Sequence, residues 1–362
     1  MAKRRVGWTL RVESRRDFLE RTAAAAAWMT LAACAAKIGG GTDEVESDNS
    51  EPDAGDPEPG SAISELPGES IPAYGPVTPN ERFYITSCCG NPSVDIESWT
   101  LSIKSRGTEV RSIDYASLRA LPARDREHTL ECIGAGPRYP AISNAIWTGL
   151  PLAEIFDALG VEVPAGTIEL KFESADGYST ALPLADLERP VWLVWLMNGT
   201  ELPLDHGYPV RALVPGRYGM KNPKWITSID FIDTSYLGFW ESNGWSNTAE
   251  YRTNTLVHDP QGLDDIPAGE LVVVGTAFAG SQAIVAVEVS VDGADWAPAT
   301  IDYAPGPDVW TVWHYDVELT PGTHTIQARC TLASGETSGP EPEGTNGLEG
   351  YDGSMQVELN VV

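Results

Sequence analysis

The chain has few of the side chains that hold metals and few positive charges. Its 362 residues include only five histidines and five cysteines, and none of these is spaced as CxxC, HxxxH or HExxH, so no zinc or iron-sulfur motif is present. The 24 Lys and Arg residues face 52 Asp and Glu residues, which gives a charge of -28. This charge repels the phosphates of nucleic acids and of anionic lipids and excludes nucleic-acid binding. A bound metal would therefore be held largely by something other than protein side chains.

The first 33 residues have the pattern of an export signal. Arg15 and Arg16 precede an alanine-rich stretch without charge, residues 22–33, which is too short to span a bilayer. Paired arginines before such a stretch resemble a twin-arginine signal, and Leu-Ala-Ala-Cys, ending at Cys34, resembles a lipoprotein box. We therefore expect residues 1–33 to be a signal peptide and Cys34 to become a lipidated first residue. The mature chain would then be a membrane-anchored lipoprotein that faces the periplasm or the cell exterior.

Residues 34–70 have the composition of a solvated tether. Ten acidic residues and no basic one lie between positions 38 and 70, among many Gly, Pro and Ser residues. Such a segment buries too little apolar surface to fold, and we expect it to be disordered. Because the twin-arginine route carries folded proteins, the signal also suggests a cofactor that is inserted before export.

The rest of the chain divides into a mixed part and a β-rich part. Between residues 71 and 258, strand-like alternation at Trp99–Ile103 is followed by helical spacing at Leu150–Leu159. Between residues 259 and 362 the helical spacing disappears, and turn residues separate several β-rich runs. These runs are Leu271–Val274, Ile284–Val291, Trp310–Leu319 and Thr323–Thr331. The pattern predicts an α+β fold in which a mixed domain precedes an immunoglobulin-like β-sandwich.

Cys132 is set apart from the other cysteines by its neighbours. It follows the strand-like run Thr129–Glu131 and precedes the glycine-rich run Ile133–Pro137. A cysteine at a strand end that opens into such a turn can present its sulfur to a cavity. A buried, apolar cysteine has the same pattern, and the residues alone do not decide between the two.

A second informative segment is rich in basic residues. Arg211, Arg217, Lys221 and Lys224 lie within 14 positions, and no acidic residue occurs from His206 through Ile229. In so acidic a chain, basic side chains grouped with glycines are typical of a site for phosphate or another anion. A basic surface strip without a ligand is the alternative.

Six short motifs, taken in order, resemble the sulfite oxidase family of molybdopterin enzymes. They are Thr78–Tyr84, Leu130–Cys132, Ala145–Leu152, Asp176–Tyr178, Met197–Gly199 and His206–Arg211. The resemblance covers about 280 residues, because the trailing sandwich is also similar to that family's C-terminal domain. It implies a molybdopterin-binding catalytic domain over residues 71–258, a dimerisation-type domain over residues 259–362, and oxygen-atom transfer to or from a small substrate.

The resemblance also implies roles for particular residues. Cys132 would be the thiolate ligand of molybdenum, and a molybdenum-molybdopterin cofactor would supply the other donors. Further cofactor contacts are implied along the chain. They would come from Tyr84 and Ile85 on the first strand, Ser174, His206, Arg211, Asn222, Pro223 and Lys224.

The chain departs from the family where the substrate would bind. The family usually has an arginine shortly after the aromatic pair, whereas here the chain continues Ile85, Thr86, Ser87. Near the family's active-site tyrosine, counting places Trp245, and Arg138 follows Cys132 one residue later than usual. Trp245 and Arg138 are the candidate catalytic side chains beside Cys132. Sulfite needs cationic donors, so a neutral sulfoxide that gives up its oxygen remains an alternative substrate.

Two further expectations concern redox partners and cysteine pairing. No CxxCH haem motif occurs, so electrons would be exchanged with a separate carrier such as a c-type cytochrome or a membrane haem subunit. Cys88 and Cys89 are either two small residues at a turn or a disulfide, with each other or with another cysteine. The alternative to an enzyme is a lipoprotein that binds or adheres without a cofactor.

Overall fold

The computed structural model describes residues 75–137, 140–185, 189–261, 265–339 and 347–362. The predicted signal peptide, the lipidation site Cys34, the tether and Arg138 lie outside the described residues. The described residues all belong to one compact unit. The division of this unit into domains at residue 259 stays a prediction. None of the helices in the described residues is long and apolar enough to cross a membrane.

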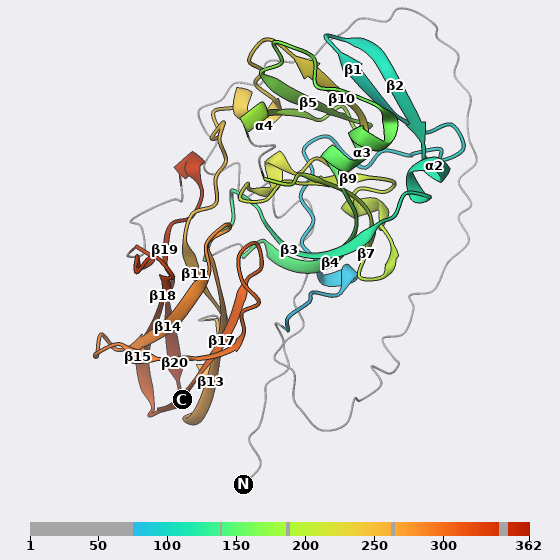
Figure 1. Cartoon of the computed structure of the whole chain (residues 1–362). Helices are drawn as coiled ribbons and strands as arrows, with labels where there is room; N and C mark the ends of the chain where they lie inside the picture. The colour runs from blue at the N-terminus through green and yellow to red at the C-terminus, as the bar shows by residue number, and fades with distance from the viewer. Residues whose placement is uncertain (1–74, 138–139, 186–188, 262–264, 340–346) are drawn as a thin grey trace, which may run out of the picture. The chain divides into compact units, whose positions relative to one another are not determined.

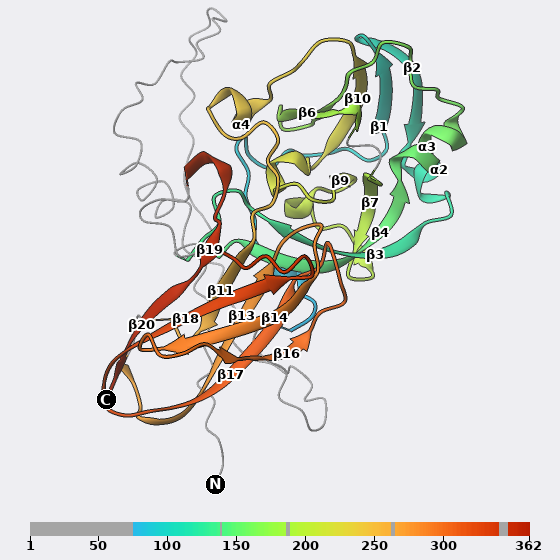
Figure 2. The same cartoon turned by 60° about the vertical axis from the view of Figure 1, so that its left-hand side comes forward.

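Strands dominate the described residues, and the helices are short (Figures 1 and 2). The α-helices are α2 (Tyr115–Arg119), α3 (Leu152–Leu159) and α4 (Phe239–Ser242). Single 3-10 turns are η1 (Asn80–Arg82), η3 (Leu204–His206), η4 (Gly219–Lys221) and η5 (Gly347–Glu349). The mixed α and β architecture expected for the first part is therefore correct only in part, because sheets form most of it.

Two five-stranded sheets form the part that precedes residue 254. The first sheet contains β1 (Thr100–Ser105), β2 (Thr108–Asp114), β5 (Glu169–Ser174), β6 (Ser179–Pro183) and β10 (Ile226–Ile232), in the order β2-β1-β10-β5-β6. The second contains β3 (Arg124–Glu131), β4 (Ile142–Pro151), β7 (Trp192–Met197), β8 (Thr200–Glu201) and β9 (Arg211–Leu213). Only β1 and β10 pair in parallel within them, and the other pairs are antiparallel.

The local sequence explains the helix that packs on these sheets. In α3 the apolar side chains of Leu152, Ile155 and Phe156 are buried on one face. The helix ends at Gly160, whose φ of +63° lies in the left-handed region that glycine tolerates best. The helix predicted over Leu150–Leu159 is thus confirmed, with its first two residues belonging to β4 instead.

Two more five-stranded sheets share one apolar core in the C-terminal part. One contains β11 (Asn254–Asp259), β13 (Gly269–Phe278), β16 (Thr300–Tyr303), β17 (Thr311–Leu319) and β19 (Gly353–Ser354). The other contains β12 (Asp265–Ile266), β14 (Ile284–Val291), β15 (Ala297–Pro298), β18 (Gly322–Leu332) and β20 (Gln356–Val361). Alternating burial along β18 and β20 places every second side chain in the core. The four β-rich runs predicted in this part are confirmed.

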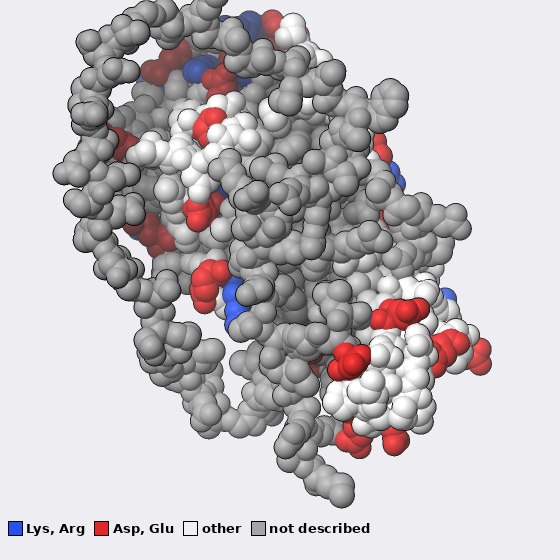
Figure 3. All heavy atoms as spheres, turned by 180° about the vertical axis from the view of Figure 1, so that it is seen from behind, with Lys and Arg blue, Asp and Glu red and all other residues white. Residues whose placement is uncertain are grey.

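Most acidic side chains lie at the surface, and several large aromatic ones lie inside. On the face drawn in Figure 3, red Asp and Glu side chains are spread over the described surface and blue Lys and Arg side chains are few. Trp147, Trp195 and Trp313 are almost completely buried. At Gly275 an added Cβ would lie 2.2 Å from the Trp313 ring, so only glycine lets β13 and that ring approach. These three tryptophans therefore belong to the core.

Candidate functional site

The sulfur of Cys132 lies at the point where β3 ends. The Cys132 N–H donates to the Ala141 carbonyl at 2.9 Å, and the Cys132 carbonyl accepts from the Ala135 N–H at 2.8 Å, which closes a tight turn. Gly134 lies inside this turn, and a Cβ added there would be 3.9 Å from Cys132 Sγ and 3.6 Å from Cη2 of Trp245. The half-buried Cys132 and the Trp245 ring therefore face the same small space.

The groups around Cys132 Sγ disfavour a negative charge on the thiol. Burial raises the pKa of the Cys132 thiol and nearby Glu131 adds to the rise, while the Gly134 backbone and the Thr86 hydroxyl act against it. The Thr86 hydroxyl is itself buried and forms no hydrogen bond of normal geometry. Trp240 and Trp245 contact each other edge to face, with ring centroids 6.1 Å apart, and pack on a small core that contains Met220. One wall of the site is therefore apolar and aromatic.

Arg211 is the most deeply buried cation on the other side of the site. It lies on β9 and is 5% exposed. Its guanidinium donates to the carbonyls of His206 at 3.0 Å and Asn222 at 3.3 Å, and it lies 5.0 Å from the centre of the Trp147 ring. Its Nε has no hydrogen-bond partner, and burial lowers the pKa of Arg211 to about 10. The guanidinium is thus held in place by neutral groups only.

Lys224 and His206 complete this cluster. Lys224 Nζ donates to the Asp205 carbonyl at 2.8 Å, and burial, with the charge of Arg211, lowers the pKa of Lys224 to about 7. His206 Nε2 lies 2.9 Å from the Asn80 carbonyl, and burial lowers the pKa of His206 to about 4, which leaves its ring neutral. Among the described residues no carboxylate forms a salt bridge with Arg211 or Lys224.

Gly207 explains why two cations lie so close together. Its φ is +116°, and an added Cβ would lie 3.0 Å from Cβ of both Arg211 and Lys224. A larger residue would therefore be strained and would push the two side chains apart. The glycine lets β9 and the segment after η4 converge, and this convergence places the two positive charges together.

The other two basic residues of the segment are paired inside the protein, which corrects the expectation that all four could bind an anion. Lys221 and Glu241 form a buried salt bridge at 2.5 Å, and Lys221 Nζ also donates to the Ala181 carbonyl at 3.0 Å. Arg217 forms a salt bridge with Glu250 at 2.8 Å. Only Arg211 and Lys224 remain for an external negative charge.

The remaining predicted contact residues lie nearby with different surroundings. Tyr84 and Ile85 belong to an irregular segment rather than to the first strand, which corrects that expectation, and Ile85 is 49% exposed. The Tyr84 hydroxyl lies 2.9 Å from the position of a Cβ added at Gly219, which places it beside Glu131 at the end of β3. Tyr84 also acts electrostatically on Arg211.

Asn222, Pro223 and Ser174 contribute in distinct ways. The Asn222 side chain accepts from the Val214 N–H at 2.6 Å and donates to the carbonyls of Arg217 and Tyr218, so it shapes the loop itself. The Pro223 carbonyl accepts from the Ala212 N–H at 3.0 Å. The hydroxyl of Ser174, at the end of β5, is buried without a hydrogen-bond partner. These placements leave the roles of the three residues as predictions.

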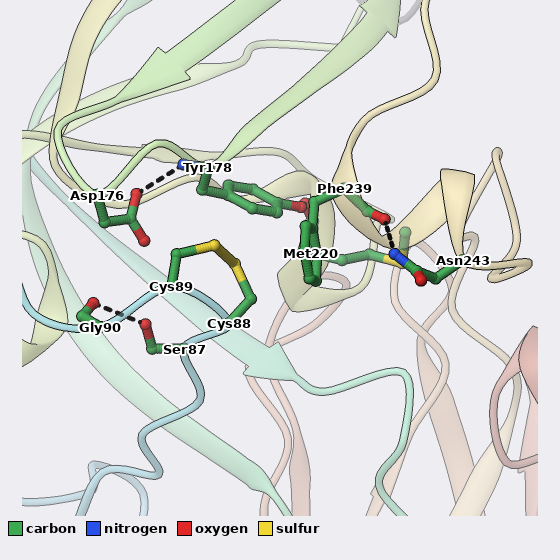
Figure 4. The surroundings of a disulfide bond; sticks show 9 residues. All are labelled: Ser87, Cys88, Cys89, Gly90, Asp176, Tyr178, Met220, Phe239 and Asn243. Atoms are coloured by element: carbon green, nitrogen blue, oxygen red, sulfur yellow. Dashed lines mark hydrogen bonds between the residues drawn. A yellow bond between two sulfur atoms is a disulfide. The ribbon is translucent and has the colours of Figure 1, made fainter. Parts of the chain in front are cut away.

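Three features of the site were missed or left open at the level of sequence. Asp176 follows β5 and acts electrostatically on Lys224, although its motif alone suggested no role. Glu241 pairs with Lys221 and has no distinguishing sequence signal. Cys88 and Cys89 form a disulfide with each other, and Figure 4 shows Asp176 and Tyr178 beside it.

Comparisons with known proteins identify relatives of this chain. A family model described as oxidoreductase molybdopterin binding domain matches residues 89–240. The chain is 30% identical over 333 aligned positions to sulfite oxidase of Gallus gallus, covering 76% of this chain and 72% of that protein. It is 25% identical to mitochondrial sulfite oxidase of Homo sapiens, covering 70% of this chain but only 55% of that protein.

A plant relative and a solved structure extend the similarity. The chain is 26% identical to sulfite oxidase of Arabidopsis thaliana, covering 69% of this chain and 79% of that protein. The crystal structure of the sulfane dehydrogenase SoxCD from Paracoccus pantotrophus superimposes with a TM-score of 0.70 at 22% identity, covering 83% of this chain and 88% of that one. The latter similarity is one of fold.

Proposed function

Because the chain belongs to the sulfite oxidase family of molybdopterin-dependent oxidoreductases, we propose that it transfers one oxygen atom to or from a small substrate at a molybdenum atom held by Cys132. When bound, the molybdenum-molybdopterin cofactor supplies the two-electron chemistry of this transfer. The observation that carries the proposal is that buried Arg211 and half-buried Lys224 lie close together and form no salt bridge with a carboxylate among the described residues. The cofactor brings a phosphate, which is the charge that this pair lacks.

The residues of the site fit such a cofactor at the end near Cys132 and at the end near Arg211. At one end the Cys132 sulfur is half-buried in a tight turn, which suits a soft metal ligand. At the other end Arg211 presents an Nε without a partner, and Ser174 presents a hydroxyl without one. Buried polar groups are rarely left unpaired, so these atoms indicate a polar ligand between them. Neutral His206 donates from Nε2 to the Asn80 carbonyl, so its Nδ1 would accept a hydrogen bond there without adding charge.

Substrate choice is set by the groups that face the sulfur. Thr86 and Trp245 offer a hydroxyl and an indole where an anion would need cations. This favours a second candidate substrate class, a neutral organic sulfoxide that gives up its oxygen, over sulfite. An assay with an artificial electron carrier distinguishes the two, because sulfite oxidation passes two electrons to the oxidised carrier and yields sulfate, whereas sulfoxide reduction takes two electrons from the reduced carrier and yields a thioether and water.

A single substitution sharpens the substrate test. Thr86→Arg would place a guanidinium beside the sulfur and is expected to raise kcat/KM for sulfite at least tenfold, while Thr86→Val serves as the uncharged control. If wild-type protein oxidises sulfite with a KM that Thr86→Arg leaves unchanged, the neutral-substrate candidate is wrong. If neither substrate is turned over by protein that carries molybdenum, oxygen-atom transfer to these classes is excluded.

The setting of the enzyme is also proposed. A twin-arginine signal over residues 1–33, lipidation at Cys34 and an acidic tether to residue 70 would hold a catalytic domain, residues 71–258, and an immunoglobulin-like domain, residues 259–362, outside the cytoplasm. Electrons would pass to or from a separate carrier such as a c-type cytochrome or a membrane haem subunit, and the second domain would support a homodimer. Cys34→Ala is expected to release the protein from the membrane fraction, and paired Arg→Lys changes at Arg15 and Arg16 to block export.

A further inference from the structure

The disulfide between Cys88 and Cys89 lies in the irregular segment that joins η1 to β1. Cys88 is half-buried and Cys89 is exposed, so a small reductant can reach the bond. Across from it lies the turn between β5 and β6, which carries Asp176 and Tyr178 (Figure 4). A carboxylate oxygen of Asp176 and the two sulfur atoms lie within 4.8 Å of one another. The disulfide thus forms the contact between two segments that are far apart in sequence.

Both ends of the candidate site are connected to this contact. Thr86, two residues before Cys88, places its hydroxyl where it affects the Cys132 sulfur. Asp176, on the other side of the disulfide, acts electrostatically on Lys224. A movement of residues 86–90 would therefore change the surroundings of the metal-ligand sulfur and of the cation pair together.

Few other interactions hold this segment. Ser87 Oγ donates to the Gly90 carbonyl at 2.9 Å, and the Asn91 side chain donates to Asp205. Across the described residues, no backbone hydrogen bond joins residues 85–92 to a strand. Gly90, with a φ of +104°, lets the chain turn sharply directly after the disulfide. The disulfide is the covalent restraint on the two residues at the centre of this segment.

We propose that Cys88 and Cys89 form a reversible two-electron redox site in the wall of the candidate site, whose oxidised form keeps Thr86 beside Cys132 and the segment beside Asp176. A dithiol, or two molecules of a low-molecular-weight thiol, reduces it. The sulfur-sulfur bond breaks, each sulfur gains one electron and one proton, and the reductant becomes a disulfide. The functional consequence rests on the proposed function, but the redox chemistry does not.

The first experiment tests the redox site itself. The full chain is alkylated with iodoacetamide before and after treatment with dithiothreitol and is then digested. The mass of the peptide that contains both cysteines is measured by mass spectrometry. Without dithiothreitol the peptide is expected to be unalkylated and two hydrogens lighter than the dithiol form. After dithiothreitol it is expected to carry two alkyl groups, and air or glutathione disulfide is expected to reverse the change. Alkylation of both cysteines without reductant would overturn the proposal.

The second experiment tests the link to the site with a double variant, Cys88→Ser with Cys89→Ser, and with Cys330→Ala as control, since Cys330 is a buried cysteine in the C-terminal core. Molybdenum retained per chain after gel filtration is the readout. Reduction is expected to speed molybdenum loss from wild type and control two- to tenfold, whereas the double variant loses it at that faster rate with or without reductant. Equal rates for all three proteins, reduced and oxidised, would contradict the link. Wild-type protein without molybdenum would instead contradict the proposed function, and the peptide masses would still decide the redox site.

Discussion

The C-terminal core and the candidate site differ in the kind of side chain that they bury. Among the described residues, the core shared by the two C-terminal sheets is built from apolar side chains, including Trp310 and Trp313, and contains no buried Lys, Arg, Asp or Glu. The candidate site and its supports bury Arg211, Lys221, Glu131 and Glu241. Burial of an unpaired charge costs free energy. The apolar core therefore raises the free energy of unfolding, whereas the unpaired buried charge of the site lowers it.

The site itself contains both kinds of buried charge, and this contrast separates support from function. Lys221 and Glu241 satisfy each other and join η4 to α4, the helix that carries Trp240. Arg211 has only backbone carbonyls and a ring as partners. We interpret a paired buried charge as support for the fold and an unpaired one as a binding group for a ligand. Substitution of Lys221 and of Arg211 tests this distinction.

The largest effect is expected from Cys132→Ser, which removes the metal-ligand sulfur. A hydroxyl is a poor ligand for a metal that prefers soft donors, so turnover should fall at least a thousandfold while the circular dichroism spectrum stays that of wild type. Cys330→Ala, in the C-terminal core, should keep full activity. A Cys132→Ser protein with wild-type turnover would show that this sulfur is not the ligand.

The next largest effect is expected from Lys221→Met, which leaves Glu241 buried without its partner. Loss of one member of a buried pair typically costs about 3 to 5 kcal/mol, and urea unfolding should show a loss of this size. The double variant that adds Glu241→Gln should recover part of it, because the uncompensated charge is then gone. An unchanged unfolding midpoint for Lys221→Met would mean that the pair does not anchor α4.

The pH dependence of stability should carry the signature of Glu131. Burial raises the pKa of Glu131 from 4.5 to about 8, so the folded state keeps a proton that the unfolded state releases. Below pH 4.5 Glu131 is protonated in both states and does not change the free energy of unfolding. Between pH 4.5 and pH 8 the free energy of unfolding falls as the pH rises. In cofactor-free protein, Glu131→Gln should therefore match wild type near pH 4 and exceed it by on the order of 2 to 4 kcal/mol at pH 9. Parallel stability curves for the two proteins would contradict this assignment.

The smallest change in the free energy of unfolding is expected from Arg211→Met, and its sign is opposite to that of Lys221→Met. In cofactor-free protein the change removes an unpaired buried charge and should stabilise the fold by about 1 to 2 kcal/mol, although the same variant should retain less than a tenth of the wild-type cofactor. Arg329→Met, at an arginine paired with Glu288 in the C-terminal sheets, is the control and should keep the cofactor. Destabilisation of Arg211→Met without cofactor loss would mean that Arg211 is structural.

Local patterns predicted the parts of the fold that depend on local sequence. The strand runs of the C-terminal sheets, helix α3 with its Gly160 end and the strand before Cys132 all follow from periodicity and turn residues. Pairing across the chain did not follow, because β1 pairs with β10 more than 100 residues later and no local signal encodes that register. The large share of sheet in the first part was not predicted for the same reason, because it also depends on pairing between strands that are distant in sequence.

The candidate site shows the same limit. The acid-free segment from His206 indicated an anion site, but only packing reveals that Lys221 and Arg217 are neutralised by Glu241 and Glu250. The electrostatic effect of Asp176 on Lys224 likewise depends on which loops meet in space, and the pairing of Cys88 with Cys89 rather than with another cysteine is seen only in the structure. Sequence thus identified the candidate segments, and the structure separated the basic residues that form salt bridges from those that do not.

The measurement that tests the central claim most directly is the molybdenum and molybdopterin content of the full chain, purified from a host that makes the cofactor. The account predicts about one molybdenum and one molybdopterin per chain, and near zero for Cys132→Ser and Arg211→Met. Folded wild-type protein that contains neither would contradict it and would favour a binding module without a cofactor.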